Sequence, residues 1–372
     1  MVTGPSRRHV LIAGSAAFGL GSATRQTRSK IDLWDNASGP HLRGVVFPQR
    51  RVYPEIDGDT FLGPGPVGAP ITNRSLDELA AAGANLALLS YPGIFTERAP
   101  YQPDPAIEDH LAELVERCVQ RGIFVVIGFR SGPGRSEFTF HRDSAGDWFP
   151  ASMINERVWQ DPLAQDAWCS MWRYVAQQFS GHRGIAGYLP MVEPNASHVV
   201  THFNWPRFAM RMANAIREAD AETPVLLSPD GYANADYAAE LDLSLVPLSV
   251  LMLHDYSPYE YTHAPARGAA YFNEADAAIS PPSATRWAIG EFGVQRWVRD
   301  ADLFLRLRLQ SLEEQGANSA FFHWPTGWQV YEQVENAWNP LMGSDTGNNR
   351  RMANAPLLQV LRRYWSRNSI RP

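Results

Sequence analysis

Two glutamates stand at matching points of two short apolar segments that lie far apart in the chain. Glu193 ends the segment Ile185–Val192 and is followed at once by Pro194, whereas Glu291 ends the segment that begins at Arg286. Pro194 has no backbone N–H, so a strand in the first segment should end near Glu193. Burying a carboxylate is costly unless it is paired. Each strand-end glutamate is therefore a candidate for chemistry, and an ion pair with a nearby arginine is the structural alternative.

The composition sets the class of protein. A chain of 372 residues can form one large α/β domain or two smaller ones, and 45% hydrophobic residues suffice for a large core. The net charge of −6, without a run of lysines or arginines, argues against a nucleic-acid surface. The 12 tryptophans and 13 tyrosines are numerous, which fits either a large core or contacts with the flat faces of sugar rings.

The N-terminus has the pattern of an export signal. Arg7 and Arg8 precede a run of small and apolar residues through Ala23, which is too short to span a membrane as a mature helix. We interpret residues 1–23 as a twin-arginine-type signal peptide, residues 24–40 as a polar leader, and the protein as exported to the periplasm or medium. Val10 stands where phenylalanine is commoner, and a frayed cytosolic tail is the alternative. No later segment is long and apolar enough for a membrane span.

Short apolar segments alternate with helical patterns from residue 41 to residue 372. The helical pattern from Ser75 includes Glu78 three residues on, which predicts a capping box. Eight strand–helix units predict a (β/α)₈ TIM barrel in a single domain, with its active site at the carboxyl ends of the strands. A doubly wound sheet is the competitor, but no glycine-rich phosphate loop follows the first strand. The predicted strands are Leu42–Phe47, Asn85–Leu89, Ile123–Phe129, Ile185–Val192, Val225–Ser228, Leu248–Leu253, Arg286–Ile289 and Asn318–Phe322.

Chemically active residues stand at several of the predicted strand ends. Strand four ends at Glu193, strand six at His254 and Tyr256, strand seven at Glu291, and strand eight at Trp324. Strands four and seven are three steps apart in an eight-strand ring, so their tips can face each other across the mouth. Two carboxyl groups about 5 Å apart would form the catalytic pair of a retaining glycosidase.

These strand ends resemble glycoside hydrolase family 5, the cellulase–mannanase family, over nearly the whole of residues 41–372. The resemblance implies that Glu193, before Pro194, is the acid/base and that Glu291, in Glu-Phe-Gly, is the nucleophile. It further implies that Tyr256 hydrogen-bonds the nucleophile, that His254 contacts a substrate hydroxyl or the acid/base, and that Trp324 forms the floor under the sugar. The proximity of the two carboxylates should raise the pKa of the acid.

Three positions depart from the family pattern. Val192 replaces the asparagine before the acid/base and Leu88 replaces the strand-two arginine. The strand-three histidine is not evident, and the segment from Phe129 to Arg135 stands in its place. We hypothesise that Arg130 supplies the charge lost at Leu88 and that Asn195 takes over hydroxyl binding. Glu137 and Asp230 are further carboxylates that could contact substrate.

The sequence therefore predicts a retaining β-glycosidase that hydrolyses an oligo- or polysaccharide with two glutamates. No group of residues has metal-ligand spacing, and no cofactor is expected.

Cys118 and Cys169 are interpreted as buried thiols, although a single disulfide is possible. Long loops at residues 130–160 and 324–354 favour an exo-acting or short-oligosaccharide pocket. A catalytically impaired carbohydrate-binding barrel is the main alternative, and hydrolysis of a non-sugar bond is a third.

Overall fold

The computed structural model describes residues 29–372 except 267, 269, 281, 285 and 335. The predicted signal peptide lies outside the described residues. Within the part of the chain that is described, no helix is long and apolar enough to cross a membrane. Cys118 and Cys169 are both free thiols, as predicted, but only Cys118 is fully buried and Cys169 is half-buried.

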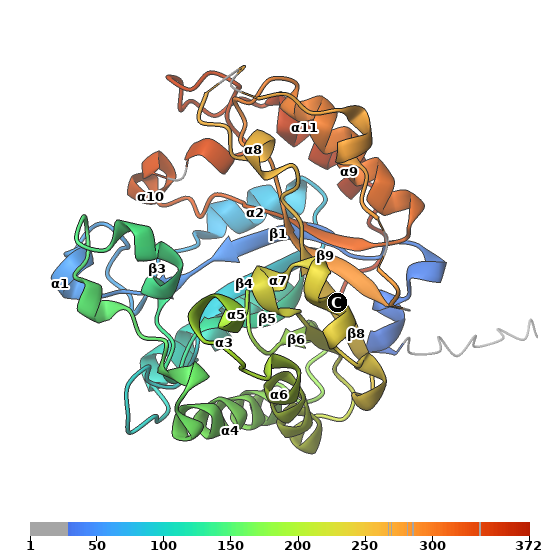
Figure 1. Ribbon diagram of the computed structural model, residues 1–372. Helices are drawn as coiled ribbons and strands as arrows, with labels where there is room; N and C mark the ends of the chain where they lie inside the picture. Colours follow the sequence, from blue (N-terminus) through green and yellow to red (C-terminus); the bar gives the residue numbers. More distant parts are fainter. Residues whose placement is uncertain (1–28, 267, 269, 281, 285, 335) are drawn as a thin grey trace, which may run out of the picture.

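Eight parallel strands close into a barrel, which confirms the predicted (β/α)₈ fold in one domain (Figure 1). Each strand pairs with its neighbours in the order β1-β10-β9-β8-β7-β6-β5-β4, and the small sheet of β2 (Arg50–Arg51) and β3 (Val67–Gly68) lies in the loop after β1. The barrel strands are β1 (Arg43–Pro48), β4 (Leu86–Pro92), β5 (Phe124–Ser131), β6 (Ile185–Leu189), β7 (Val225–Leu227), β8 (Ser249–His254), β9 (Trp287–Phe292) and β10 (Asn318–Phe321).

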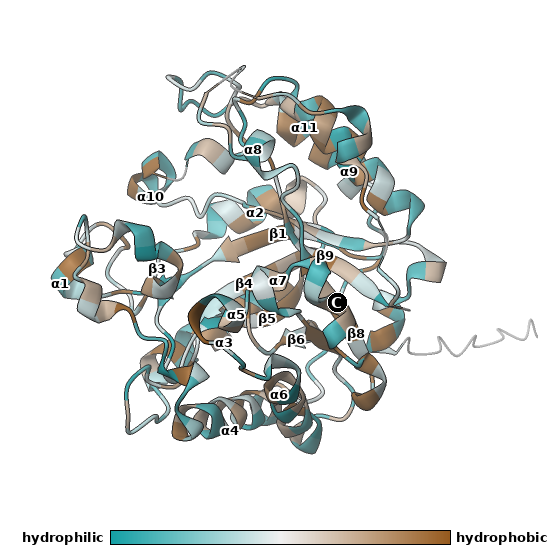
Figure 2. Cartoon of the chain, viewed as in Figure 1, coloured by the Kyte–Doolittle hydropathy of each residue, from teal (hydrophilic) through white to brown (hydrophobic). Residues whose placement is uncertain are grey.

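Side chains alternate between the inside and the outside of the barrel, as the pleat of a strand requires. Leu88 belongs to an inner cluster that fills the barrel, whereas its neighbour Leu89 belongs to the outer cluster beneath the helices. Because both faces are covered, the strands are hydrophobic along their length, and Figure 2 shows them as mostly brown. The outer helices carry both hydrophilic and hydrophobic residues (Figure 2).

Six long helices surround the barrel, and α4 packs beside α6 (Figure 1). Two of the predicted helices, after β7 and β8, are only 3₁₀ turns, η6 (Ala235–Glu240) and η8 (Glu274–Ala277). The long helices are α2 (Asn73–Ala81), α3 (Pro105–Val119), α4 (Pro162–Gln178), α6 (Trp205–Ala219), α9 (Ala301–Glu314) and α11 (Pro356–Trp365), and the short ones are α1 (Pro54–Asp57), α5 (Ala196–Val199), α7 (Asp230–Ala233), α8 (Tyr259–Thr262) and α10 (Gln329–Val334).

The predicted capping box at Ser75 is wrong. Thr72 is the N-cap of α2, and its side chain accepts a hydrogen bond from the backbone N–H of Ser75. Ser75 is buried inside the helix and donates its hydroxyl to the carbonyl of Pro325. A tertiary contact with the loop after β10 therefore uses the serine that the local pattern assigned to the helix end.

The amino end of the barrel is closed by residues that the sequence assigned to the polar leader. Two 3₁₀ turns, η1 (Lys30–Trp34) and η2 (Asn36–Ser38), lie there, and Ile31, Leu33 and Trp34 join the inner cluster. The Nε1 of Trp34 donates to the carbonyl of Ala186 at 3.0 Å. Lys30–Ser38 therefore belongs to the folded domain, because the open end of the barrel buries this segment.

Replacing Trp34 with alanine should destabilise the whole domain. The indole is 1% exposed, and its loss would leave a cavity and an unpaired carbonyl, which costs about 3–5 kcal/mol. Urea unfolding followed by circular dichroism measures the change. Leu163→Ala, at a side chain that is 71% exposed on α4, is the matched control and should change the free energy of unfolding by about 0.5 kcal/mol or less. Equal stability of Trp34→Ala and wild type would mean that the segment Lys30–Ser38, which closes the amino end of the barrel, does not stabilise the domain through Trp34.

Candidate active site

Glu193 stands four residues beyond the end of β6. The strand ends at Leu189, earlier than predicted, because Pro190 has no N–H to continue the ladder. Glu193 has a φ of +49°, a backbone conformation that is uncommon for a residue with a side chain. Such a conformation persists only where the surroundings hold it, and it is frequent at functional sites.

Arg135 holds the backbone around Glu193. Its Nη1 donates to the carbonyl of Val192 at 2.9 Å, and its Nη2 donates to the carbonyl of Glu193 at 2.5 Å. The guanidinium is fully buried, and burial together with the nearby cation of Arg130 lowers the pKa of Arg135 to about 9. Arg135 therefore remains a cation at neutral pH and positions Glu193.

A tight turn brings Arg135 back beside Arg130. Gly132 and Arg135 exchange two backbone hydrogen bonds of 2.8 Å, with Pro133 and Gly134 between them. Gly134 has a φ of +70°, which suits the third position of a type II turn after proline. Arg135 is not among the predicted site residues, although Pro-Gly between two nearby arginines signals such a return of the chain.

Glu291 lies on β9 with its side chain 2% exposed. Tyr256 donates its hydroxyl to Oε2 of Glu291 at 3.0 Å, as the sequence predicted. The other oxygen, Oε1, is buried and has no hydrogen-bond partner among the described residues. One oxygen of Glu291 is thus fixed, and the other is available to a substrate atom.

His254 joins the two carboxylates. Its Nδ1 lies 3.1 Å from Oε1 of Glu193 and 3.6 Å from Oε2 of Glu291. Gly290 of β9 leaves room for this arrangement, since a Cβ there would meet Nε2 of His254 at 3.1 Å and the side chain of Met252 at 2.8 Å. The predicted cluster of Glu193, His254, Tyr256 and Glu291 therefore comes together at the carboxyl end of the barrel.

The surroundings shift the pKa values of the two carboxylates in opposite directions. Burial raises the pKa of Glu291, and the charge of Glu193 adds to this effect. Burial also acts to raise the pKa of Glu193, but the hydrogen bond and charge of His254, together with Arg130, outweigh it and lower that pKa. The two carboxylates in turn raise the pKa of His254 against the effect of its burial. The expected rise thus falls on Glu291 in the free site, and not on Glu193.

Arg130 lies beside two carboxylates, those of Glu193 and Glu137. Its Nη1 is 3.8 Å from Oε2 of Glu193, and its Nε is 3.1 Å from Oε2 of Glu137. Leu88 and Val192 both belong to the inner cluster of the barrel, so apolar packing occupies the places of the two polar family residues. Glu137 is committed to Arg130, whose charge lowers the pKa of Glu137 despite burial.

Two predicted substrate contacts are wrong. Asn195 is 1% exposed, and its Oδ1 accepts from Nη2 of Arg135 at 3.2 Å, so it supports the Glu193 loop. Trp324 is fully buried in the outer cluster, where its Nε1 donates to the carbonyl of Ser75 and its ring lies 5.9 Å from that of Trp365. Trp324 therefore packs between the barrel and the helices and forms no sugar floor, because the chain turns outward after Phe322.

Two other aromatic residues pack against Tyr256. The rings of Phe322 and Trp338 lie 6.1 and 5.8 Å from that of Tyr256, and those two rings are 5.6 Å apart. Trp338 comes from η9 (Asn336–Trp338) in the long loop after β10. This contact supports Tyr256, which in turn holds Glu291.

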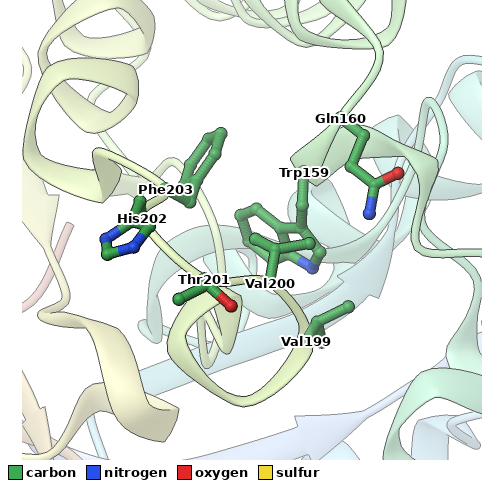
Figure 3. A pocket seen from close by; sticks show the side chains of 7 residues that line it. All are labelled: Trp159, Gln160, Val199, Val200, Thr201, His202 and Phe203. Carbon is green, nitrogen blue, oxygen red and sulfur yellow. The ribbon is translucent and has the colours of Figure 1, made fainter.

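A pocket of about 430 Å³ lies beside the Glu193 loop and is separate from the carboxylate pair (Figure 3). The indole of Trp159 lies at its centre, and the segment from Val199 to Phe203 forms the opposite wall (Figure 3). The ring of Trp159 also lies 5.7 Å from the guanidinium carbon of Arg135. The pocket is therefore next to the residue that positions Glu193.

The carboxylate pair is also where a cation could be held. One donor atom from each of Glu193, His254 and Glu291 lies within 4.8 Å of the others. No metal site was predicted, because these three residues lie far apart in the sequence and do not have the spacing of a metal-ligand motif. Arg130 already places a positive charge beside Glu193, which offsets the need for a metal charge.

Comparison with known proteins assigns the chain to a protein family. The cellulase model of glycosyl hydrolase family 5 matches residues 59–324. A β-xylosidase from Phanerodontia chrysosporium is 26% identical over 157 residues, which are 42% of this chain and 31% of that protein. The chain therefore spans less than a third of that relative.

Solved structures share the fold. Thermotoga maritima Cel5A in complex with cellobiose superposes with a TM-score of 0.60 at 14% identity, over 90% of this chain and 99% of that one. A hyperthermophilic endo-β-1,4-glucanase gives a TM-score of 0.62 at 15% identity, over 89% and 100%. With the family match across most of the barrel, the resemblance found in the sequence is confirmed: the chain belongs to glycosyl hydrolase family 5 and is a divergent glycoside hydrolase of that family.

Proposed function

We propose that this protein is a retaining β-glycosidase that cleaves an oligo- or polysaccharide by double displacement. One observation supports this most directly: oxygens of Glu193 and Glu291 lie within 4.8 Å of each other, on either side of His254. Retaining enzymes place their carboxyl groups about 5–5.5 Å apart, whereas inverting enzymes leave room for water at about 6.5–9.5 Å. The short distance between these oxygens supports the retaining arrangement.

Glu291 is the nucleophile in the first step. Its Oε1, which has no partner among the described residues, attacks the anomeric carbon while Tyr256 holds Oε2. The bond from the anomeric carbon to the leaving oxygen breaks, and an ester to Glu291 forms. Because the hydrogen bond from Tyr256 stabilises the carboxylate, it lowers the pKa of Glu291 against the effect of burial.

His254 stores the proton that the first step needs. In the free site His254 and Arg130 lower the pKa of Glu193 against the effect of burial, and the two carboxylates raise the pKa of His254, whose Nδ1 lies one hydrogen bond away at 3.1 Å. A proton that passes from Nδ1 of His254 to Oε1 of Glu193 makes Glu193 the acid that protonates the leaving oxygen. In the second step Glu193 takes a proton from water, and the water oxygen attacks the anomeric carbon and releases Glu291.

A carbohydrate-binding barrel without turnover is the second candidate. The apolar residues Leu88 and Val192 favour it, because each removes a polar group near the sugar. The complete arrangement of Glu193, His254 and Glu291 around one site favours the enzyme.

Substitution of each glutamate should separate the two roles. On aryl β-glycosides with poor leaving groups, Glu291→Gln should abolish turnover, and Glu193→Gln should lower it by about 10²–10⁴-fold. With a dinitrophenyl leaving group, which needs no acid, Glu193→Gln should retain bond cleavage and accumulate the glycosyl-enzyme, which intact mass spectrometry detects. A panel of glucosides, xylosides and mannosides identifies the sugar.

The stereochemistry of the first product decides the mechanism. NMR of the wild-type reaction should show the β-anomer before mutarotation, whereas initial release of the α-anomer would contradict double displacement. Binding of oligosaccharides without turnover by either wild type or Glu291→Gln would support the binding barrel.

Removal of the Arg130 cation should move the pH profile upward. Arg130 lowers the pKa of both Glu193 and Glu291 by its charge, so Arg130→Met raises both. The limbs of kcat/KM against pH should then shift to higher pH by about one unit. Arg130→Lys keeps the charge and should hold the profile close to that of wild type. An unchanged profile and unchanged KM in Arg130→Met would refute compensation for Leu88.

A further inference from the structure

We propose that Tyr232, with Phe140 and His198, forms the binding site for the leaving group of the substrate, a pyranose or aryl ring attached to the oxygen that Glu193 protonates. This site rests on the proposed function and extends it to the part of the substrate that departs. None of the three residues was selected from the sequence, because they lie in three separate loops.

The backbone at Tyr232 has an unusual conformation. Gly231 has a φ of +64° within α7, and the next two residues, Tyr232 and Ala233, have values of +64° and +63°. Two consecutive residues with side chains in this region are strained, and such strain persists only where other contacts determine the backbone. The turn therefore holds the Tyr232 side chain in a direction that an ordinary helical turn would not give.

The contacts that hold this turn come from the Glu193 loop. The backbone N–H of Tyr232 donates to the carbonyl of Pro194 at 2.8 Å. Asp230 accepts from the N–H of Ser197 at 2.9 Å through Oδ2 and from the N–H of Gly231 at 2.8 Å through Oδ1. Asp230 therefore connects the Tyr232 turn to the Glu193 loop and is not a substrate contact. Helices α5 and α7 accordingly lie side by side at the mouth of the barrel (Figure 1).

The ring of Tyr232 is accessible and is connected to Glu193 through Phe140 and Arg130. It is 37% exposed, and its centroid lies 4.9 Å from that of His198 and 6.5 Å from that of Phe140. The ring of Phe140 covers the guanidinium of Arg130 at 3.8 Å, and Arg130 in turn contacts Glu193. A continuous line of contacts thus leads from the acid/base to an exposed aromatic ring.

The chemistry of this group fits a departing ring. The atom that Glu193 protonates belongs to the leaving group, so whatever is attached to it leaves the site on the Glu193 side. An exposed tyrosine offers an apolar face to a sugar or aryl ring and a hydroxyl at its edge. The imidazole of His198, which is exposed, can exchange a hydrogen bond with a sugar hydroxyl.

The experiment compares substrates with and without such a ring. Tyr232→Asn removes the aromatic ring but tolerates a positive φ, since asparagine is enriched there. We expect kcat/KM to fall about 10-fold on a disaccharide or phenyl β-glycoside of the preferred sugar, the loss typical of one aromatic contact. On the β-glycosyl fluoride, whose leaving group is a single atom, kcat/KM should stay within about 2-fold of wild type.

Two further variants control for structure. Tyr232→Phe keeps the ring and should retain most of the activity on both substrates. Tyr174→Asn, at a tyrosine of similar exposure (39%) on the outer helix α4, should change neither. Equal loss of Tyr232→Asn on the fluoride and on the disaccharide, or loss on neither, would overturn the proposal. Failure of wild type to hydrolyse either substrate would instead refute the proposed function and this site with it.

Discussion

The burial of two carboxylates at the mouth of an apolar barrel is the constraint on which the rest of the site depends. Glu291 is 2% exposed, and the side chain of Glu193 is 16% exposed. Charges in such surroundings are stable only with partners. His254 lies between the two carboxylates, Tyr256 fixes Glu291, and Arg130 lies beside Glu193. Each partner also shifts the pKa of a carboxylate. The contacts that permit burial therefore also influence which groups of the site carry a proton.

The long loop after β5 is best understood through the arginines that it carries. Arg130 supplies charge, and the Pro133–Gly134 turn returns the chain so that Arg135 reaches the carbonyls around Glu193. Arg135 of this loop holds the strained backbone of Glu193, and the strained turn at Tyr232 is in turn hydrogen-bonded to Pro194 beside Glu193. Glu193, Arg130 and the proposed leaving-group site are therefore connected by contacts between three neighbouring loops.

The barrel interior explains the departures from the family pattern. Leu88 and Val192 are part of an apolar inner cluster that continues down to Trp34 at the amino end. Polar groups in that cluster would need partners that the surrounding leucines and valines do not offer. The cation is instead carried by Arg130 at the rim, where it contacts Glu137 and Glu193.

The sequence by itself determined the eight strands, the single domain and the pairing of Glu193 with Glu291, because continuous apolar runs and strand-end residues are local signals. It did not determine the capping of α2, the closure of the amino end of the barrel by Trp34, or the surroundings of Trp324 and Asn195. Those depend on contacts between segments far apart in the chain, such as Trp324 with Trp365. The direction of the pKa shifts was likewise decided only in three dimensions, since it follows from how deeply each carboxylate is buried and which cation lies within reach.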